Sequence, residues 1–175
     1  MLQGLDLTVL PGETVALVGH TGAGKSTVAA LVPRLMDPQR GAVLLDGIDV
    51  RSLRVESLRW QVSLVLQDCV LYRRSLRENS AMGRPGASDA AVVRAARLAL
   101  VDQFAARLPA GLDTPVGERG ADLSGGQRQR VAIARAILRD APILTWTSPR
   151  APSTERPSSS SPKRWRTCPH NGRRW

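Results

Sequence analysis

The feature that most constrains this chain is the glycine-rich stretch GHTGAGKST at residues 19–27. It fits the pattern G-x-x-x-x-G-K-[ST] and follows an apolar run at residues 14–18. In such a loop the backbone N–H groups turn inward to hold phosphate oxygens, and side chains on Gly22 and Gly24 would obstruct them. Lys25 can then reach the β- and γ-phosphates, and the Ser26 hydroxyl can bind Mg²⁺. The stretch predicts a nucleoside triphosphate site; the alternative is a chance glycine-rich turn.

The bulk properties fit one globular domain. The chain has 175 residues, and no run approaches the roughly 20 apolar residues that cross a bilayer. We expect no signal peptide, and the two cysteines, Cys69 and Cys168, predict no disulfide framework, so we expect a cytosolic compartment. The net charge of +10 is uneven: residues 1–145 hold 18 Lys and Arg against 14 Asp and Glu, and residues 146–175 hold 7 against 1. The basic character is therefore mostly that of the last 30 residues.

The order of patterns along the chain predicts an α/β core followed by a helical segment. We expect strands at residues 2–9 and 14–18, a turn at Pro11-Gly12, and a helix from Lys25 to about Leu35. Short strands should follow at residues 42–45 and 62–66. From residue 73 to 108 the chain is rich in Ala, Arg and Leu, with an N-cap expected at Ser88 and a buried face at Val92, Ala95, Ala96 and Ala99. A helix at 127–138 and a strand at 142–144 complete the pattern.

A second motif, LSGGQRQR at residues 123–130, gives the chain a family resemblance. Ser124 and the two glycines after it open a helix and can form a second phosphate-binding surface of N–H groups and a hydroxyl; an ordinary N-cap serine is the alternative. With the phosphate loop before it and Gln67 between them, the chain resembles the nucleotide-binding domain of ATP-binding cassette (ABC) transporters over residues 2 to about 144, and its exporter type in particular.

The resemblance implies a P-loop NTPase fold with a mixed or parallel sheet, flanking helices and an α-helical subdomain. It implies an α/β core at 1–72, the helical subdomain at 73–122, the signature helix and a following strand at 123–144, and a tail at 145–175. The cofactors would be ATP and Mg²⁺, with Ser26 and Gln67 as metal contacts and Gln67 as the remaining catalytic residue. The implied nucleotide contacts are Gly19, Thr21, Gly22, Ala23, Gly24, Lys25, Ser26 and Thr27, joined across a head-to-tail dimer by Ser124, Gly125, Gly126 and Gln127.

The implied partners are a second nucleotide-binding domain and the transmembrane domains of an exporter, which would hold the chain at the inner face of the cell membrane. Leu71, Tyr72 and residues 75–79 resemble the surface that receives the transmembrane domains. Residues 114–120, with Glu118, resemble a loop of exporter-type members that also contacts them. No nucleic acid is expected as a partner.

The sequence departs from the family after Leu144. The family continues with apolar residues and then Asp-Glu, which hold Mg²⁺ and polarise the attacking water, whereas residues 145–150 read TWTSPR and no carboxylate appears before Glu155. Read in a frame that starts one base earlier than Trp146, the same bases can encode Leu-Asp-Glu and then Ser-Ala-Leu-Asp. We therefore expect that residues from about 145 onward result from a one-base frameshift, are disordered, and leave the chain truncated at both ends and deficient in hydrolysis.

Three other interpretations were weighed. A chromosome-maintenance or repair ATPase also carries LSGGQ, but such proteins insert a long coiled coil between the motifs, and this chain has no sustained heptads there. The basic tail could bind nucleic acid or an anionic membrane, although its Pro and Ser residues interrupt any helix. The chain could also be a remnant without function.

Overall fold

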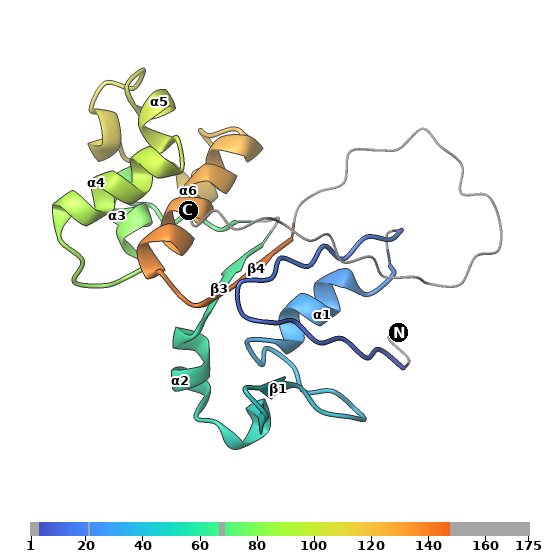
Figure 1. Cartoon of the computed structure of the whole chain (residues 1–175). Coiled ribbons are helices and arrows are strands. Elements are labelled where there is room, and N and C mark those ends of the chain that lie inside the picture. The colour runs from blue at the N-terminus through green and yellow to red at the C-terminus, as the bar shows by residue number, and fades with distance from the viewer. Residues whose placement is uncertain (1–3, 21, 67–68, 148–175) are drawn as a thin grey trace. The chain divides into compact units, whose positions relative to one another are not determined.

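The computed structural model describes residues 4–20, 22–66 and 69–147 (Figure 1). The chain divides into two compact units between Val28 and Ala29, and each unit is taken by itself. The segments expected to be a disordered tail and to contain Gln67 lie outside the described residues, apart from residues 145–147.

The first unit holds the sequence that leads to the phosphate loop. The expected turn at Pro11-Gly12 is present: the N–H of Glu13 donates to the Leu10 carbonyl at 3.0 Å, and Gly12 has φ +78°. The strands expected on either side of this turn are not assigned within the described residues, although side-chain exposure alternates from Glu13 to His20. A strand requires a ladder of backbone hydrogen bonds with a neighbour, and the described parts of these two segments take part in none.

Helix α1 spans Lys25–Leu31 and ends earlier than the expected Leu35. Pro33 has no N–H to continue the helical hydrogen bonds. Arg34 adopts the left-handed conformation with φ +52°, and the N–H of Leu35 donates to the Ala30 carbonyl at 2.9 Å. This six-to-one hydrogen bond is that of a Schellman motif, which stops the helix.

Two short antiparallel strands follow, β1 (Leu44–Leu45) and β2 (Ile48–Asp49), which are joined at Asp46-Gly47. Asp46 and Gly47 both have positive φ, +50° and +80°, as a type I′ hairpin turn requires. The turn expected from the sequence is therefore confirmed. The 3₁₀ helix η1 (Val50–Ser52) and helix α2 (Val55–Trp60) then lead into the central strands.

The central strands β3 (Val62–Val65) and β4 (Ile143–Trp146) run parallel and side by side (Figure 1). Their register pairs Val62 with Ile143 and Val65 with Trp146. The strand expected to end at Leu144 thus continues for two residues into the segment expected to be disordered, because Thr145 and Trp146 extend the ladder with β3. Parallel and antiparallel pairs are both present, as the expected mixed sheet requires.

Helices dominate the chain from residue 76 to 139. They are α3 (Leu76–Ala81), α4 (Asp89–Leu98), α5 (Val101–Ala105), the 3₁₀ turns η2 (Gly111–Asp113) and η3 (Glu118–Gly120), and α6 (Gly125–Arg139). Figure 1 shows α3 to α6 gathered in one group. Ser88 caps α4 as expected, with its hydroxyl accepting from the N–H of Ala91 at 3.3 Å. The face of α4 expected to be buried is buried.

The core of the helical group is built around α6. Its buried apolar residues are Leu71, Leu76, Ala96, Ala99, Val101, Phe104, Ala105, Val116, Leu123, Val131 and Ala134. This cluster joins helices α3 to α6 with the segment after β3 and the loop before α6. A smaller cluster of Val50, Leu58 and Val62 packs with Val32 and Ile143, and thus lies under the two central strands.

An arginine connects three elements of the helical group at its surface. Arg77 of α3 donates to the carboxylates of Asp113 at 2.7 Å and of Asp89 at 2.5 Å. Its guanidinium holds the pKa of the Asp113 carboxyl below its ordinary value. The ion pairs fix α3 against the start of α4 and against η2.

Replacing Gly83 with alanine is expected to lower the free energy of unfolding by about 3 kcal/mol. Gly83 is buried after α3, and a Cβ there would lie 2.1 Å from the carbonyl oxygen of Arg135 in α6. The obstacle is helix backbone, so the two elements would have to separate. Urea unfolding measures the change.

Gly126→Ala is the matched control for Gly83→Ala. No atom lies within 4 Å of a Cβ at Gly126, which is helical, so alanine should leave the free energy of unfolding unchanged or raise it by up to about 1 kcal/mol. Equal destabilisation by the two substitutions would contradict the close approach of Gly83 to α6.

Candidate functional site

The phosphate loop folds back on itself at the start of α1. Gly22 and Gly24 have φ of +83° and +93°, a region that L-amino acids with side chains rarely enter. The Lys25 ammonium donates to the carbonyl oxygens of Gly19 at 2.8 Å and of His20 at 2.9 Å. Lysine therefore spans the loop it belongs to. Ser26 and Thr27 are exposed beside it, and Thr21 lies outside the described residues.

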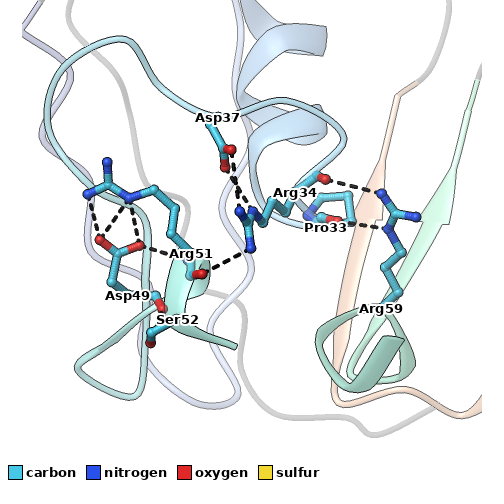
Figure 2. A network of polar contacts seen from close by, with 7 residues as sticks. All are labelled: Pro33, Arg34, Asp37, Asp49, Arg51, Ser52 and Arg59. Carbon is cyan, nitrogen blue, oxygen red and sulfur yellow. Dashed lines mark hydrogen bonds and ion pairs between the residues drawn. The ribbon is translucent and has the colours of Figure 1, made fainter. Parts of the chain in front are cut away.

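Arginine side chains fix the opposite end of α1 (Figure 2). Arg59 of α2 donates to the carbonyl oxygens of Pro33 at 3.3 Å and of Arg34 at 3.2 Å. Arg34 donates to the Asp37 carboxylate at 2.9 Å and to the Arg51 carbonyl at 3.0 Å. A cation at the C-terminal end of a helix is favourable because the last carbonyls carry partial negative charge. The helix that begins at Lys25 is thus held where it ends.

The signature motif opens helix α6 with a capping box. The Ser124 hydroxyl accepts from the N–H of Gln127 at 3.3 Å, and the Gln127 side-chain oxygen accepts from the N–H of Ser124 at 2.8 Å. This reciprocal pair satisfies two N–H groups of the helix terminus. The helix begins at Gly125, two residues before the expected start, since the glycines form its first turn.

The two signature glycines have no reason within this chain to lack a side chain. Neither Gly125 nor Gly126 has positive φ. A Cβ at Gly126 would meet nothing within 4 Å, and one at Gly125 would meet only the Arg128 side chain at 3.9 Å. Each glycine lowers helix stability by up to about 1 kcal/mol relative to alanine. Ser124, Gly125 and Gly126 are exposed, which leaves this turn open to close approach by another molecule.

Asn79 and Arg135 connect α6 to the segment that follows β3. The Asn79 side chain is fully buried, donates to the Tyr72 carbonyl at 3.0 Å and accepts from the Tyr72 N–H at 2.9 Å. Arg135 of α6 donates to the side-chain oxygen of Asn79 at 2.7 Å and to the Val70 carbonyl at 2.9 Å. Burial lowers the pKa of Arg135, and burial raises the pKa of the neighbouring Cys69 thiol.

The surface expected to receive transmembrane domains is only partly exposed. Leu71, Leu76 and Asn79 are 1% exposed or less, because they face the core of the helical group. Tyr72 and Val70 are each 56% exposed and line a hollow of about 340 Å³ between β3, α3 and α6. Glu118 is also exposed. The structure therefore moves the accessible part of this surface to Val70 and Tyr72.

The carboxyl end of the central strands carries no carboxylate from β4. Thr147 follows β4, and its N–H donates to the Val65 carbonyl at 2.9 Å. Ligands of open α/β sheets bind at this edge of the sheet. Within residues 4–20, 22–66 and 69–147, no group of three or more Asp, Glu, His and Cys side chains could hold a metal ion. Gln67, the expected metal and catalytic residue, lies outside these ranges.

A protein-family model described as ABC transporter matches residues 2–151. This chain belongs to the ABC transporter family. Both motifs lie inside the matched residues, so the resemblance based on them is confirmed, as is the P-loop NTPase fold. A solved structure of a bacterial Atm1-family ABC exporter with ATP bound matches with a TM-score of 0.80 and 50% identity, covering 83% of this chain and 25% of that chain.

Curated relatives of this ABC transporter chain are also membrane exporters by name. It is 51% identical over 144 residues to the ATP-dependent lipid A-core flippase of Legionella pneumophila strain Paris, and 51% identical over 143 residues to the beta-(1-->2)glucan export ATP-binding/permease protein NdvA of Rhodopseudomonas palustris strain BisB5. Both alignments cover 82% of this chain and 24% of the relative. The chain thus spans about a quarter of the length of the curated relatives it matches. Its described helices include none with the length and apolar character of a membrane span.

Sequence reasoning did not find the arginines that hold the site. Arg59, Arg128 and Arg135 all donate to backbone carbonyls that are distant in sequence or lie in a preceding loop. Arginine is common in this chain, so no spacing distinguishes these three positions from the rest. An apolar face that includes an arginine, as at Arg135 in α6, was the available signal.

Proposed function

We propose that this chain is the nucleotide-binding domain of an ABC exporter, which binds ATP with Mg²⁺ at residues 19–27. The observation that carries the proposal is the phosphate loop itself, with Gly22 and Gly24 in a glycine conformation and the Lys25 ammonium held over the loop carbonyls. The loop fits a triphosphate, because phosphate oxygens can replace those carbonyls as the partners of Lys25. Ser26 would hold Mg²⁺ together with Gln67.

The signature turn supports a dimer in which Ser124 to Gln127 contact the nucleotide of a second copy. The exposed hydroxyl and N–H groups at the start of α6 are suited to an anion, and Gly125 and Gly126 leave room for one. The transmembrane domains of the exporter would contact the exposed residues Val70, Tyr72 and Glu118. In the cell the chain would therefore lie at the cytoplasmic face of the membrane.

We further propose that the chain as given hydrolyses ATP very slowly. The two carboxylates that follow this strand in the family have no counterpart at residues 145–150. In phosphoryl transfer such groups supply metal binding and water positioning, and their loss commonly costs several orders of magnitude in rate. A one-base frameshift after Leu144 accounts for the change.

Addition of MgATP is expected to convert the purified chain from monomer to dimer, with ADP much less effective. The physical reason is that the signature turn needs a terminal phosphate to contact. Sedimentation velocity measures the change, and equilibrium binding of a fluorescent ATP analogue measures occupancy.

Gly126→Asp is the control for the signature contact. Its side chain meets no atom of its own chain, yet its carboxylate would repel a phosphate across the interface. It should bind nucleotide like the unaltered chain and stay monomeric. A chain that binds no nucleotide would refute the phosphate site, and equal dimerisation with and without ATP would refute the shared one.

A further inference from the structure

The side chain of Arg128 turns back from α6 onto the loop that precedes the signature. One of its nitrogens, Nη1, donates to the Leu123 carbonyl at 2.5 Å and to the Gly120 carbonyl at 3.2 Å. Long side chains in helices lean toward the N-terminus, so an arginine four residues after Ser124 can reach these carbonyls. Leu123 directly precedes Ser124, so Arg128 fixes the residue from which the capping box begins.

The loop held by Arg128 is itself tightly placed. Gly120 is buried with φ +70°, and a Cβ there would lie 2.9 Å from the Leu71 side chain and 3.2 Å from Cδ of Arg128. The N–H of Val116 donates to the Arg74 carbonyl at 3.0 Å. Contacts therefore run without a break from the segment after β3, through Gly120 and Arg128, to the start of α6.

The charge of Arg128 is unfavourable where it stands. Helix N-termini carry partial positive charge, so a cation in the first turns of a helix lowers stability by a few tenths of a kcal/mol or more. Both hydrogen bonds of Arg128 within the described residues go to neutral carbonyls rather than to a carboxylate. An arginine here is accounted for by its geometry, which lets one guanidinium nitrogen join two carbonyls.

We propose that Arg128 is a positioning residue for the signature motif, which holds Ser124 and the following glycines in the orientation that accepts the second copy's nucleotide. The inference rests on the proposed function of the signature turn. It assigns to Arg128 no contact with the phosphate loop of its own chain. Loss of Arg128 should therefore weaken the ATP-dependent dimer and leave nucleotide binding by the monomer unchanged.

The test compares Arg128→Met, Arg128→Lys and Arg130→Met in the full chain. Both Arg128 variants should raise the dimer dissociation constant in MgATP at least about tenfold, with the dissociation constant for the ATP analogue within about twofold of the unaltered chain. Lysine keeps the charge but lacks the planar fork. Arg130 lies two residues further along α6 and donates to one carbonyl, that of Leu100, so Arg130→Met should leave both constants unchanged. Full dimerisation by Arg128→Lys would overturn the proposal in favour of charge alone.

Amide hydrogen exchange provides a readout that does not depend on dimerisation. In the monomer, Arg128→Met should speed exchange at residues 120–127 about tenfold and leave residues 131–139 unchanged. Unchanged exchange at 120–127 would overturn the positioning role, whatever the oligomeric state. Normal exchange effects in a chain that never dimerises with ATP would instead locate the failure in the proposed function.

Discussion

Restoring the reading frame by one base after Leu144 is expected to raise the rate of ATP hydrolysis at least about a thousandfold. In the restored frame the bases at and after codon 145 would encode Leu-Asp-Glu and then Ser-Ala-Leu-Asp. The Asp would follow β4 at the carboxyl end of the parallel pair, beside Val65, where Thr147 now stands. There it can hold Mg²⁺, and the Glu can polarise the attacking water. Release of inorganic phosphate from MgATP measures the rate.

Two controls separate the carboxylates from other effects of the new sequence. The restored chain with glutamine in place of the Glu should bind ATP and remain as slow as the unaltered chain. The double substitution Thr147→Asp and Ser148→Glu, which leaves the rest of the tail in place, should make nucleotide binding more dependent on Mg²⁺. Hydrolysis by the unaltered chain at rates typical of the family, free of contaminating ATPase, would refute the deficiency. Gene sequencing that finds no Leu-Asp-Glu in the shifted frame would refute the frameshift.

Lys25→Ala is expected to weaken ATP binding at least about a hundredfold, which corresponds to roughly 2.7 kcal/mol. The substitution removes the charge that faces the β- and γ-phosphates and also removes the hydrogen bonds to the Gly19 and His20 carbonyls. Isothermal titration calorimetry with ATP measures the affinity. Because Lys25 is half-buried only by its own loop, the free energy of unfolding should change little.

Lys25→Arg is the matched control for the lysine. It keeps the positive charge, but the longer, planar guanidinium does not reproduce the compact ammonium over two carbonyls. An intermediate affinity is expected. Binding by Lys25→Ala within threefold of the unaltered chain would mean that nucleotide binds elsewhere.

The local elements were predictable where the signal is contained in a few neighbouring residues. Asp46-Gly47 indicates a hairpin turn because both positions take positive φ, and the structure has that turn. Ser88 indicates an N-cap, which is present. The end of α1 was placed too late, since the left-handed conformation of Arg34 is unusual for a residue with a Cβ and carries no sequence signal. The roles of the site residues remain predictions.

The sequence by itself determined the family and the two motifs, because a phosphate loop and a signature turn are built from backbone groups whose conformation depends on nearby glycine, serine and lysine. Only the tertiary structure decided what holds those motifs. Arg59 caps α1 from a helix more than twenty residues away, Arg135 ties α6 to Asn79 and Val70, and Gly83 lets α6 approach closely. Each of these contacts joins a side chain or a Cα to a distant backbone carbonyl. Every residue has a carbonyl, so the sequence does not record which one is chosen.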